Sequence, residues 1–165
     1  MRPISAKSPQ VGTTFSEVLI AILLLAFFFM SIFELNAICL RYIDASKESV
    51  AASQMVQDRS EALRNLAFID LTSASYLQGL LASPANGSDF AKSIIEVVKI
   101  SQYPTPNGVT QLTRDTSGSV TTDSIATDLG KGLVQVDVSA TWNMTLGGRA
   151  RSSKVTSIIA NGTKK

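Results

Sequence analysis

The chain has 165 residues, of which 45% are hydrophobic and 17% are charged, and its formal net charge is +2. That size suits one domain plus a hydrophobic segment, and the net charge is too small to indicate a nucleic-acid-binding protein by itself. The sequence has a single cysteine, Cys39, which excludes an internal disulfide. It has no histidine, which excludes His-based catalysis and most zinc sites, and no paired-carboxylate motif stands out. We therefore expect no enzyme, no metal and no cofactor.

The first predicted element is an apolar helix near the N-terminus. Residues 18–33 carry no charge and, as a helix, would extend roughly 24 Å. Extended to Leu40, the segment reaches the roughly 20 residues that cross a bilayer. The first twelve residues contain Arg2 and Lys7 and no acid, and positive charge on the short side places that side in the cytoplasm. We therefore expect a single-pass membrane protein whose remaining residues are exported.

The same helix is predicted to continue well beyond the apolar segment. Residues 41–71 contain no Gly or Pro, and their apolar residues recur at helical spacing with charged residues between them. A cleaved signal peptide would instead end in small residues soon after its apolar core. The pattern predicts one helix from Phe15 to about Leu71, with residues 13–40 in the membrane and an amphipathic half over residues 41–71.

The residues around the start of this helix form a recognisable motif. A basic leader ends in Gly12, Glu17 follows five residues later, and Val18-Leu19-Ile20-Ala21 opens the apolar run. This arrangement resembles the N-terminus of type IV prepilins and of the pseudopilins of type II secretion. The resemblance covers about 25 residues. It implies a leader over residues 1–12, cleavage by prepilin peptidase between Gly12 and Thr13, and N-methylation of Thr13, although Thr stands where Phe or Met is usual.

The resemblance also implies a function. The chain would be a structural subunit that assembles into a type IV pilus or a type II secretion pseudopilus, as a minor rather than a major subunit. Its partners would be other pilin or pseudopilin subunits, the peptidase and an inner-membrane assembly platform, with lipid around the helix. Phe15 and Glu17 would serve assembly: Glu17, which has no partner predicted on its own chain, would pair with the new Thr13 amine of a neighbouring subunit. The alternative is a signal-anchored exported binding module that does not polymerise.

Residues 72–165 are predicted to form the exported domain. A short helix is expected at 75–81, and strands at 93–101, 109–114, 133–142 and 150–160, with a polar loop over 115–131. The strand at 133–142 alternates strictly between apolar and polar residues, so one of its faces is buried. Gly147-Gly148 suits a tight hairpin turn. The fold class is α+β, a long N-terminal helix packed on a small antiparallel sheet, and pilins look like this too.

The exported domain holds three features that invite a functional interpretation. Asp115, Asp123 and Asp128 lie in a Ser/Thr-rich loop, but their spacing matches no calcium loop, so we interpret them as solvated acids. Trp142 is interpreted as a core anchor. Residues 130–165 hold six basic residues against one acid. Solvated edge-strand charges are the favoured interpretation of this excess, and a nucleic-acid partner is the alternative.

Overall fold

The computed structural model describes residues 14–145 and 147–162. The chain divides into two compact units, Met1–Leu40 and Arg41–Lys165. Helix α1, Phe15–Arg64, begins in the first unit and ends in the second. The Gly12–Thr13 bond, where cleavage and methylation are predicted, lies outside the described residues.

The described part of the first unit is a bare apolar helix. Every residue from Phe15 to Leu40 is exposed. The most apolar 18-residue window of α1 has a mean hydropathy of 2.7, and none of it is buried. By length and composition, this helix is able to cross a membrane.

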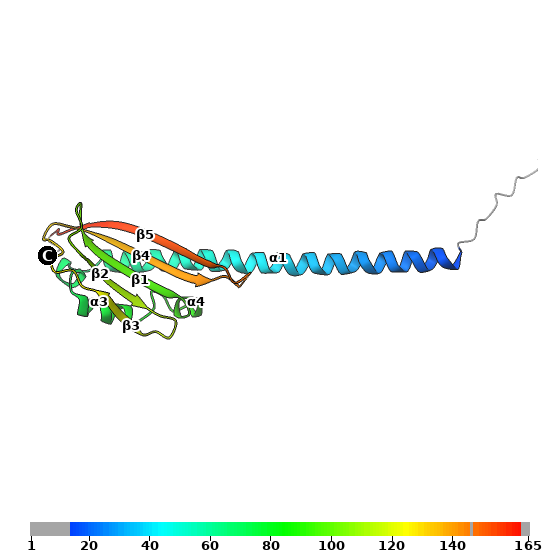
Figure 1. Ribbon diagram of the computed structural model, residues 1–165, viewed down its shortest axis with the longest axis horizontal. Coiled ribbons are helices and arrows are strands. Elements are labelled where there is room, and N and C mark those ends of the chain that lie inside the picture. The colour runs from blue at the N-terminus through cyan, green and yellow to red at the C-terminus, as the bar shows by residue number, and fades with distance from the viewer. Residues whose placement is uncertain (1–13, 146, 163–165) are drawn as a thin grey trace, which may run out of the picture. The chain divides into compact units, whose positions relative to one another are not determined.

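The second unit contains a five-stranded antiparallel sheet in the order β3-β2-β1-β4-β5 (Figure 1). The strands are β1 Ile95–Gln102, β2 Val109–Arg114, β3 Val120–Ser124, β4 Leu133–Asn143 and β5 Ala150–Ala160. Adjacent strands run antiparallel throughout. This confirms the predicted α+β class and the predicted antiparallel sheet.

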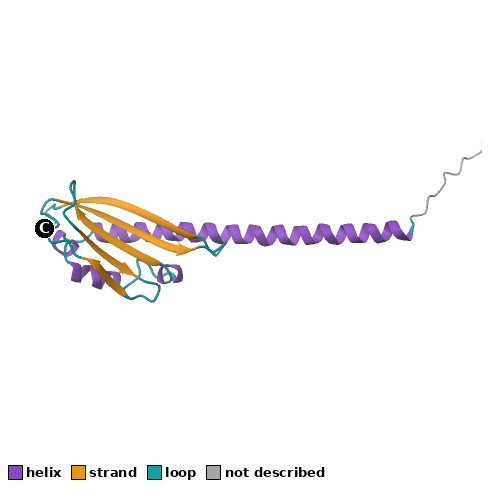
Figure 2. Ribbon diagram, in the orientation of Figure 1, coloured by secondary structure: helices purple, strands orange, loops and turns teal. Residues whose placement is uncertain are grey.

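Helices pack on one face of this sheet to make a two-layer core (Figure 2). Helices α2 Phe68–Leu71, α3 Ala74–Leu81 and α4 Asp89–Lys92 join the last part of α1 in the helical layer. The alternating pattern of β4 is realised, since its even-numbered residues from Val134 to Trp142 are buried. The core is apolar side chains from both layers, among them Ala52, Met55, Val56, Leu63, Leu71, Leu77, Leu81, Val98, Ile100 and Leu112.

The prediction of one helix as far as Leu71 is wrong. Helix α1 ends at Arg64, and Ala67 has extended backbone angles (φ −65°, ψ 146°) before α2 begins. The turn has a packing reason. Leu63 and Leu71 are both fully buried in the same core, whereas a straight helix would carry Leu71 about 12 Å further along its axis.

One other detail of the sheet differs from the sequence-based expectations. The predicted polar loop 115–131 contains strand β3, which pairs with β2 at the edge of the sheet.

The β4–β5 hairpin holds the glycine pair in its turn, as predicted. The backbone N–H of Met144 donates to the carbonyl of Arg149 at 3.0 Å and so closes the hairpin. Gly147 and Gly148 both have positive φ, 78° and 60°, which glycine adopts without a steric penalty.

Candidate functional site

The N-terminal end of α1 carries the described part of the predicted processing and assembly motif. Thr14 directly precedes the helix, and its backbone N–H donates to Oε2 of Glu17 at 2.9 Å. This bond is one half of a capping box, in which a Glu in the first turn satisfies the backbone donor just before the helix. The expectation that Glu17 has no partner on its own chain is therefore wrong. Its second oxygen, Oε1, makes no hydrogen bond with any residue that the structure describes.

Phe15 is 82% exposed at the same end of the helix. It lies two positions from Glu17, so the two side chains project from different sides of α1. The structure thus brings Thr14 and Glu17 together, and it leaves Phe15 pointing into the surroundings as a separate apolar group.

The apolar surface behind this motif is the largest exposed hydrophobic surface of the described chain. Bulky side chains emerge all round the helix between Phe15 and Leu40, including five phenylalanines, Phe15, Phe27, Phe28, Phe29 and Phe33. Covering one such side chain stabilises a protein by about 1.5–3 kcal/mol relative to leaving it in water. A helix of this kind requires lipid or the apolar helices of other molecules around it.

Within the second unit, the sequence analysis missed a buried ion pair. The Nε of Arg59 on α1 donates to Oε1 of Glu96 on β1 at 2.6 Å, and its Nη2 donates to Oε2 at 3.2 Å. The same guanidinium donates to the backbone carbonyls of Leu80 and Ser83. The Arg59 side chain is 3% exposed and that of Glu96 is 0% exposed. The pair joins the helix, the sheet and the α3–α4 connection, which is a structural role.

Two further polar side chains are buried beside the core. Arg114 lies opposite Glu96 across the β1–β2 ladder and donates from Nη1 to the carbonyl of Ala91. Trp142 packs edge-on against Phe90, with ring centroids 5.9 Å apart, as its predicted role of core anchor requires. Arg114 Nε and Trp142 Nε1 have no hydrogen-bond partner among the described residues.

The loop acids are held by local hydrogen bonds rather than gathered together. Asp123 accepts hydrogen bonds from Gln111, Thr113 and Thr121. These bonds lower the pKa of its carboxyl, and the bond from Thr113 contributes most. The carboxyl of Asp115 accepts from the backbone of Ser117 and Ser119 in the turn that follows it. Its pKa is also lowered, mainly by the hydrogen bond from the Ser117 side chain. Asp128 accepts from the backbone of Gly130. Over the described ranges, no three acidic or thiol side chains cluster as metal ligands.

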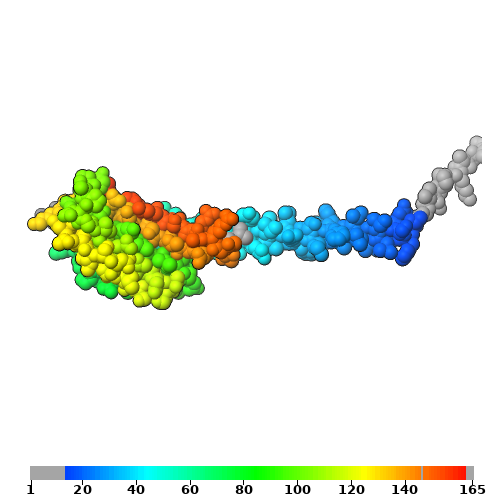
Figure 3. All heavy atoms as spheres, in the orientation of Figure 1, coloured from blue at the N-terminus to red at the C-terminus, as the bar shows by residue number. Residues whose placement is uncertain are grey.

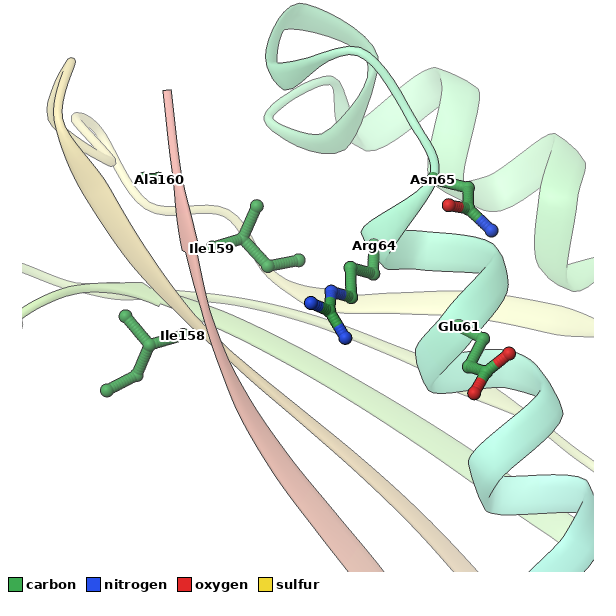
Figure 4. Close-up of a pocket in the computed structure, with 6 residues that line it drawn as sticks. All are labelled: Glu61, Arg64, Asn65, Ile158, Ile159 and Ala160. Carbon is green, nitrogen blue, oxygen red and sulfur yellow. The ribbon is translucent and has the colours of Figure 1, made fainter. Parts of the chain in front are cut away.

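Two adjoining grooves lie between the end of α1 and the end of β5. The first has a volume of about 530 Å³, and Figure 4 shows Arg64 reaching from α1 toward Ile159, while Ile158 points to the other side of the strand. The second, of about 610 Å³, extends past Ile69 to Gly162. Both grooves are open to solvent, and the residues that line them form no cluster of reactive side chains.

The basic residues of the C-terminal part occupy different surroundings. Lys154 on β5 pairs with Asp137 on β4 at 3.0 Å. Arg149 and Arg151 are exposed at the beginning of β5, where the Nε of Arg151 lies 3.0 Å from the sulfur of Met144. Strand β5 forms the outer margin of the sheet and is visible in orange and red in Figure 3. These charges on an edge strand are consistent with a role in preventing edge-to-edge pairing.

The sequence matches no protein-family model, and neither the curated proteins nor the solved structures give a significant match. The functional proposal therefore rests on the residues of this chain.

Proposed function

We propose that the chain is a pilin-like structural subunit. In this proposal it is inserted in the bacterial inner membrane, with its N-terminus in the cytoplasm and its second unit in the periplasm. Prepilin peptidase cuts it after Gly12, and it then joins other subunits in a type IV pilus or a type II secretion pseudopilus, as a minor component. It performs no catalysis.

One observation supports this proposal above the others. A carboxylate, Glu17, stands in the first turn of a helix whose following apolar residues are all exposed, and that helix leads into a compact α+β unit. An ordinary membrane anchor needs the apolar residues, and a carboxylate at their start gives it a helix cap that an uncharged residue could supply without the cost of a charge near the bilayer. Filament assembly gives the carboxylate a purpose, because cleavage would create a cationic amine on Thr13 for a neighbouring subunit to offer.

The cap that Glu17 makes on its own chain is compatible with this pairing. Thr14 keeps its backbone N–H if the chain is cut before Thr13, so Oε2 of Glu17 can go on capping the helix. Oε1 is then the oxygen that would accept from the amine of a second subunit. In an apolar filament core, a carboxylate without such a counter-charge would cost several kcal/mol.

N-terminal sequencing of the mature protein, produced together with prepilin peptidase, tests the processing step. A chain that starts at Thr13 supports the proposal. A chain that starts at Met1, or after residue 34, contradicts it and favours the alternative, an anchored exported binding module that does not polymerise.

Substitution of Glu17 tests the assembly step and separates its charge from its cap. Glu17→Gln keeps an oxygen that can accept from Thr14 N–H but removes the charge, whereas Glu17→Ala removes both. We expect both variants to be cleaved normally and both to lose filament incorporation, measured by shearing and immunoblotting. The matched control is Glu34→Gln, an exposed carboxylate on the same helix, which should assemble normally. Wild-type assembly of Glu17→Gln would show that the cap suffices and the pairing is absent.

A further inference from the structure

The beginning of the second unit contains a groove that none of the roles above uses. It has a volume of about 560 Å³ and lies between the first two turns of α1 in this unit and the β4–β5 hairpin. Its floor is the buried Ala45. The remaining lining residues are polar, aromatic or basic, with Met144 and a backbone glycine between them: Tyr42, Ser46, Ser49, Met144, Gly147, Arg149 and Arg151.

The strand geometry explains why two arginines reach this groove. Side chains at alternate positions of a strand share one face, and the odd-numbered residues of β5 from Ser153 to Ile159 are its half-buried ones, facing the helical layer. Arg151 belongs to the same odd-numbered series and lies two positions before Ser153, so its side chain projects from the same face of β5. Arg149 precedes it by two positions and lines the same groove.

The hairpin is fixed against α1 by a polar anchor. The side chain of Glu48 accepts hydrogen bonds from the backbone N–H and from the hydroxyl of Thr145. The sulfur of Met144 lies 3.0 Å from Nε of Arg151. Hydrogen bonds from Thr145 to Glu48 therefore connect the arginine-bearing hairpin to α1.

The residues that line the groove include two arginines and no acid. Neither Arg149 nor Arg151 has a carboxylate within 4.0 Å among the described residues. Of the nearby acids on α1, Asp44 is paired with Lys47 at 3.5 Å, and Glu48, which accepts from Thr145, does not line this groove. Guanidinium groups bind phosphate oxygens in bidentate fashion, and the hydroxyls of Tyr42 and Ser46 add neutral donors around the same space.

The location of the groove along the chain indicates which phosphates it meets. Tyr42 follows the last residue of the apolar segment, Leu40, by only two positions in one continuous helix, and the α1 side of the groove ends at Ser49. Tyr42 is 64% exposed, and tyrosine is enriched where a membrane helix meets the headgroups. Basic residues next to a membrane helix are attracted to anionic lipids, whereas a nucleic acid would have no reason to bind so close to the bilayer.

We propose that this groove binds the headgroup phosphates of anionic phospholipids, with Arg149 and Arg151 as the phosphate ligands and Tyr42 at the interface. The proposal rests on the membrane anchoring in the proposed function, but not on cleavage or assembly. It gives the hairpin a docked position on the bilayer while the subunit is in the membrane.

The test uses the full chain in nanodiscs of phosphatidylcholine alone and of phosphatidylcholine with phosphatidylglycerol, followed by hydrogen–deuterium exchange. Peptides covering 41–49 and 144–151 should exchange more slowly with phosphatidylglycerol, and the difference should shrink in high salt because screening weakens exposed charges. Each arginine is expected to contribute about a fivefold gain in local affinity for the anionic surface. The double variant Arg149→Gln/Arg151→Gln should lose the difference.

The matched control is Lys99→Gln/Lys131→Gln, which removes two exposed positive charges elsewhere in the second unit and should keep the difference. Equal exchange in the two lipids, or equal loss in both double variants, overturns the proposal. Protection by an added oligonucleotide, with no effect of phosphatidylglycerol, overturns it in favour of a nucleic-acid site. Failure of the chain to enter either nanodisc overturns both the lipid site and the membrane anchoring. Normal assembly of the Glu17 variants contradicts the pairing in the proposed function but does not affect the lipid site.

Discussion

The two units of this chain treat their apolar residues in opposite ways. Between Phe15 and Leu40 every side chain is exposed, so the stability of that helix depends on what surrounds it. Beyond Arg41 a set of buried apolar residues forms one core between helices and sheet, and this core also contains a buried ion pair. One helix, α1, takes part in both arrangements. Helical sequence alone therefore does not tell whether an apolar residue is reserved for other molecules or for its own fold.

The largest expected effect comes from breaking the buried ion pair of the second unit. Glu96→Ala leaves the Arg59 guanidinium without its counter-charge in a dry environment, and we expect a loss of about 3–5 kcal/mol in the free energy of unfolding. The measurement is urea unfolding of the full chain in detergent, followed by the fluorescence of Trp142. The control is Asp44→Ala, which removes one partner of an exposed ion pair. Equal stabilities of the two variants would show that the buried pair is not needed.

A smaller effect distinguishes the two kinds of leucine. Leu63 is fully buried and Leu23 is 52% exposed, although both lie on α1. Leu63→Ala should lower the free energy of unfolding of the second unit by about 2–5 kcal/mol, because it leaves a cavity in a packed core. Leu23→Ala in the same detergent should leave that free energy unchanged. A comparable loss in both variants would mean that the units do not unfold separately.

The smallest expected effect concerns the outer face of the sheet. Partial burial of Asp137 opposes its ionisation, but hydrogen bonds from Thr156, Lys154 and Gln135 outweigh it and hold the pKa of its carboxyl below the ordinary value. A carboxyl with a lowered folded-state pKa stabilises the fold above its unfolded pKa, near 4, and loses that stabilisation as the pH falls through the folded value. Asp137→Asn should therefore flatten the acid limb of the stability profile of the second unit by no more than about 1 kcal/mol.

Thr156→Val removes one of the three side chains that hydrogen-bond to Asp137 and should give an intermediate profile, measured by urea unfolding between pH 3 and pH 7. A wild-type profile for Asp137→Asn would show that the carboxylate contributes nothing to folding. In the first unit, where no packed core exists among the described residues, the same pH range should leave the exposure of the apolar helix unchanged.

Much of the fold could be predicted because single features of the sequence determined it. The alternation from Val134 to Trp142 identified β4 and its buried face, and the strand at 109–114 was placed correctly at both ends. Strand β3 was missed because Val120–Ser124 has one apolar residue and is almost wholly exposed at the edge of the sheet. Neither alternation nor a hydrophobic run marks such a strand.

The buried Arg59–Glu96 pair illustrates what local patterns cannot show. Its members are 37 residues apart, on a helix and a strand, and each has the appearance of an ordinary surface charge in its own segment. Only the register of β1 against α1 brings them together. The cap at Thr14, by contrast, was within reach of the sequence, because Thr followed three residues later by Glu before an apolar run is a recognised helix start.

The order of the core along the chain has a consequence for biosynthesis. Helix α1 contributes Ala52, Met55, Val56 and Leu63 to the core, but β4, which packs in that core with five buried residues, begins about 70 residues later. At a synthesis rate of 5–20 residues per second, the apolar stripe of α1 waits roughly 3 to 14 seconds for this strand. Until β4 has been made, the core around α1 is incomplete, and only the part of the helix beyond Arg41 is later covered by its own fold.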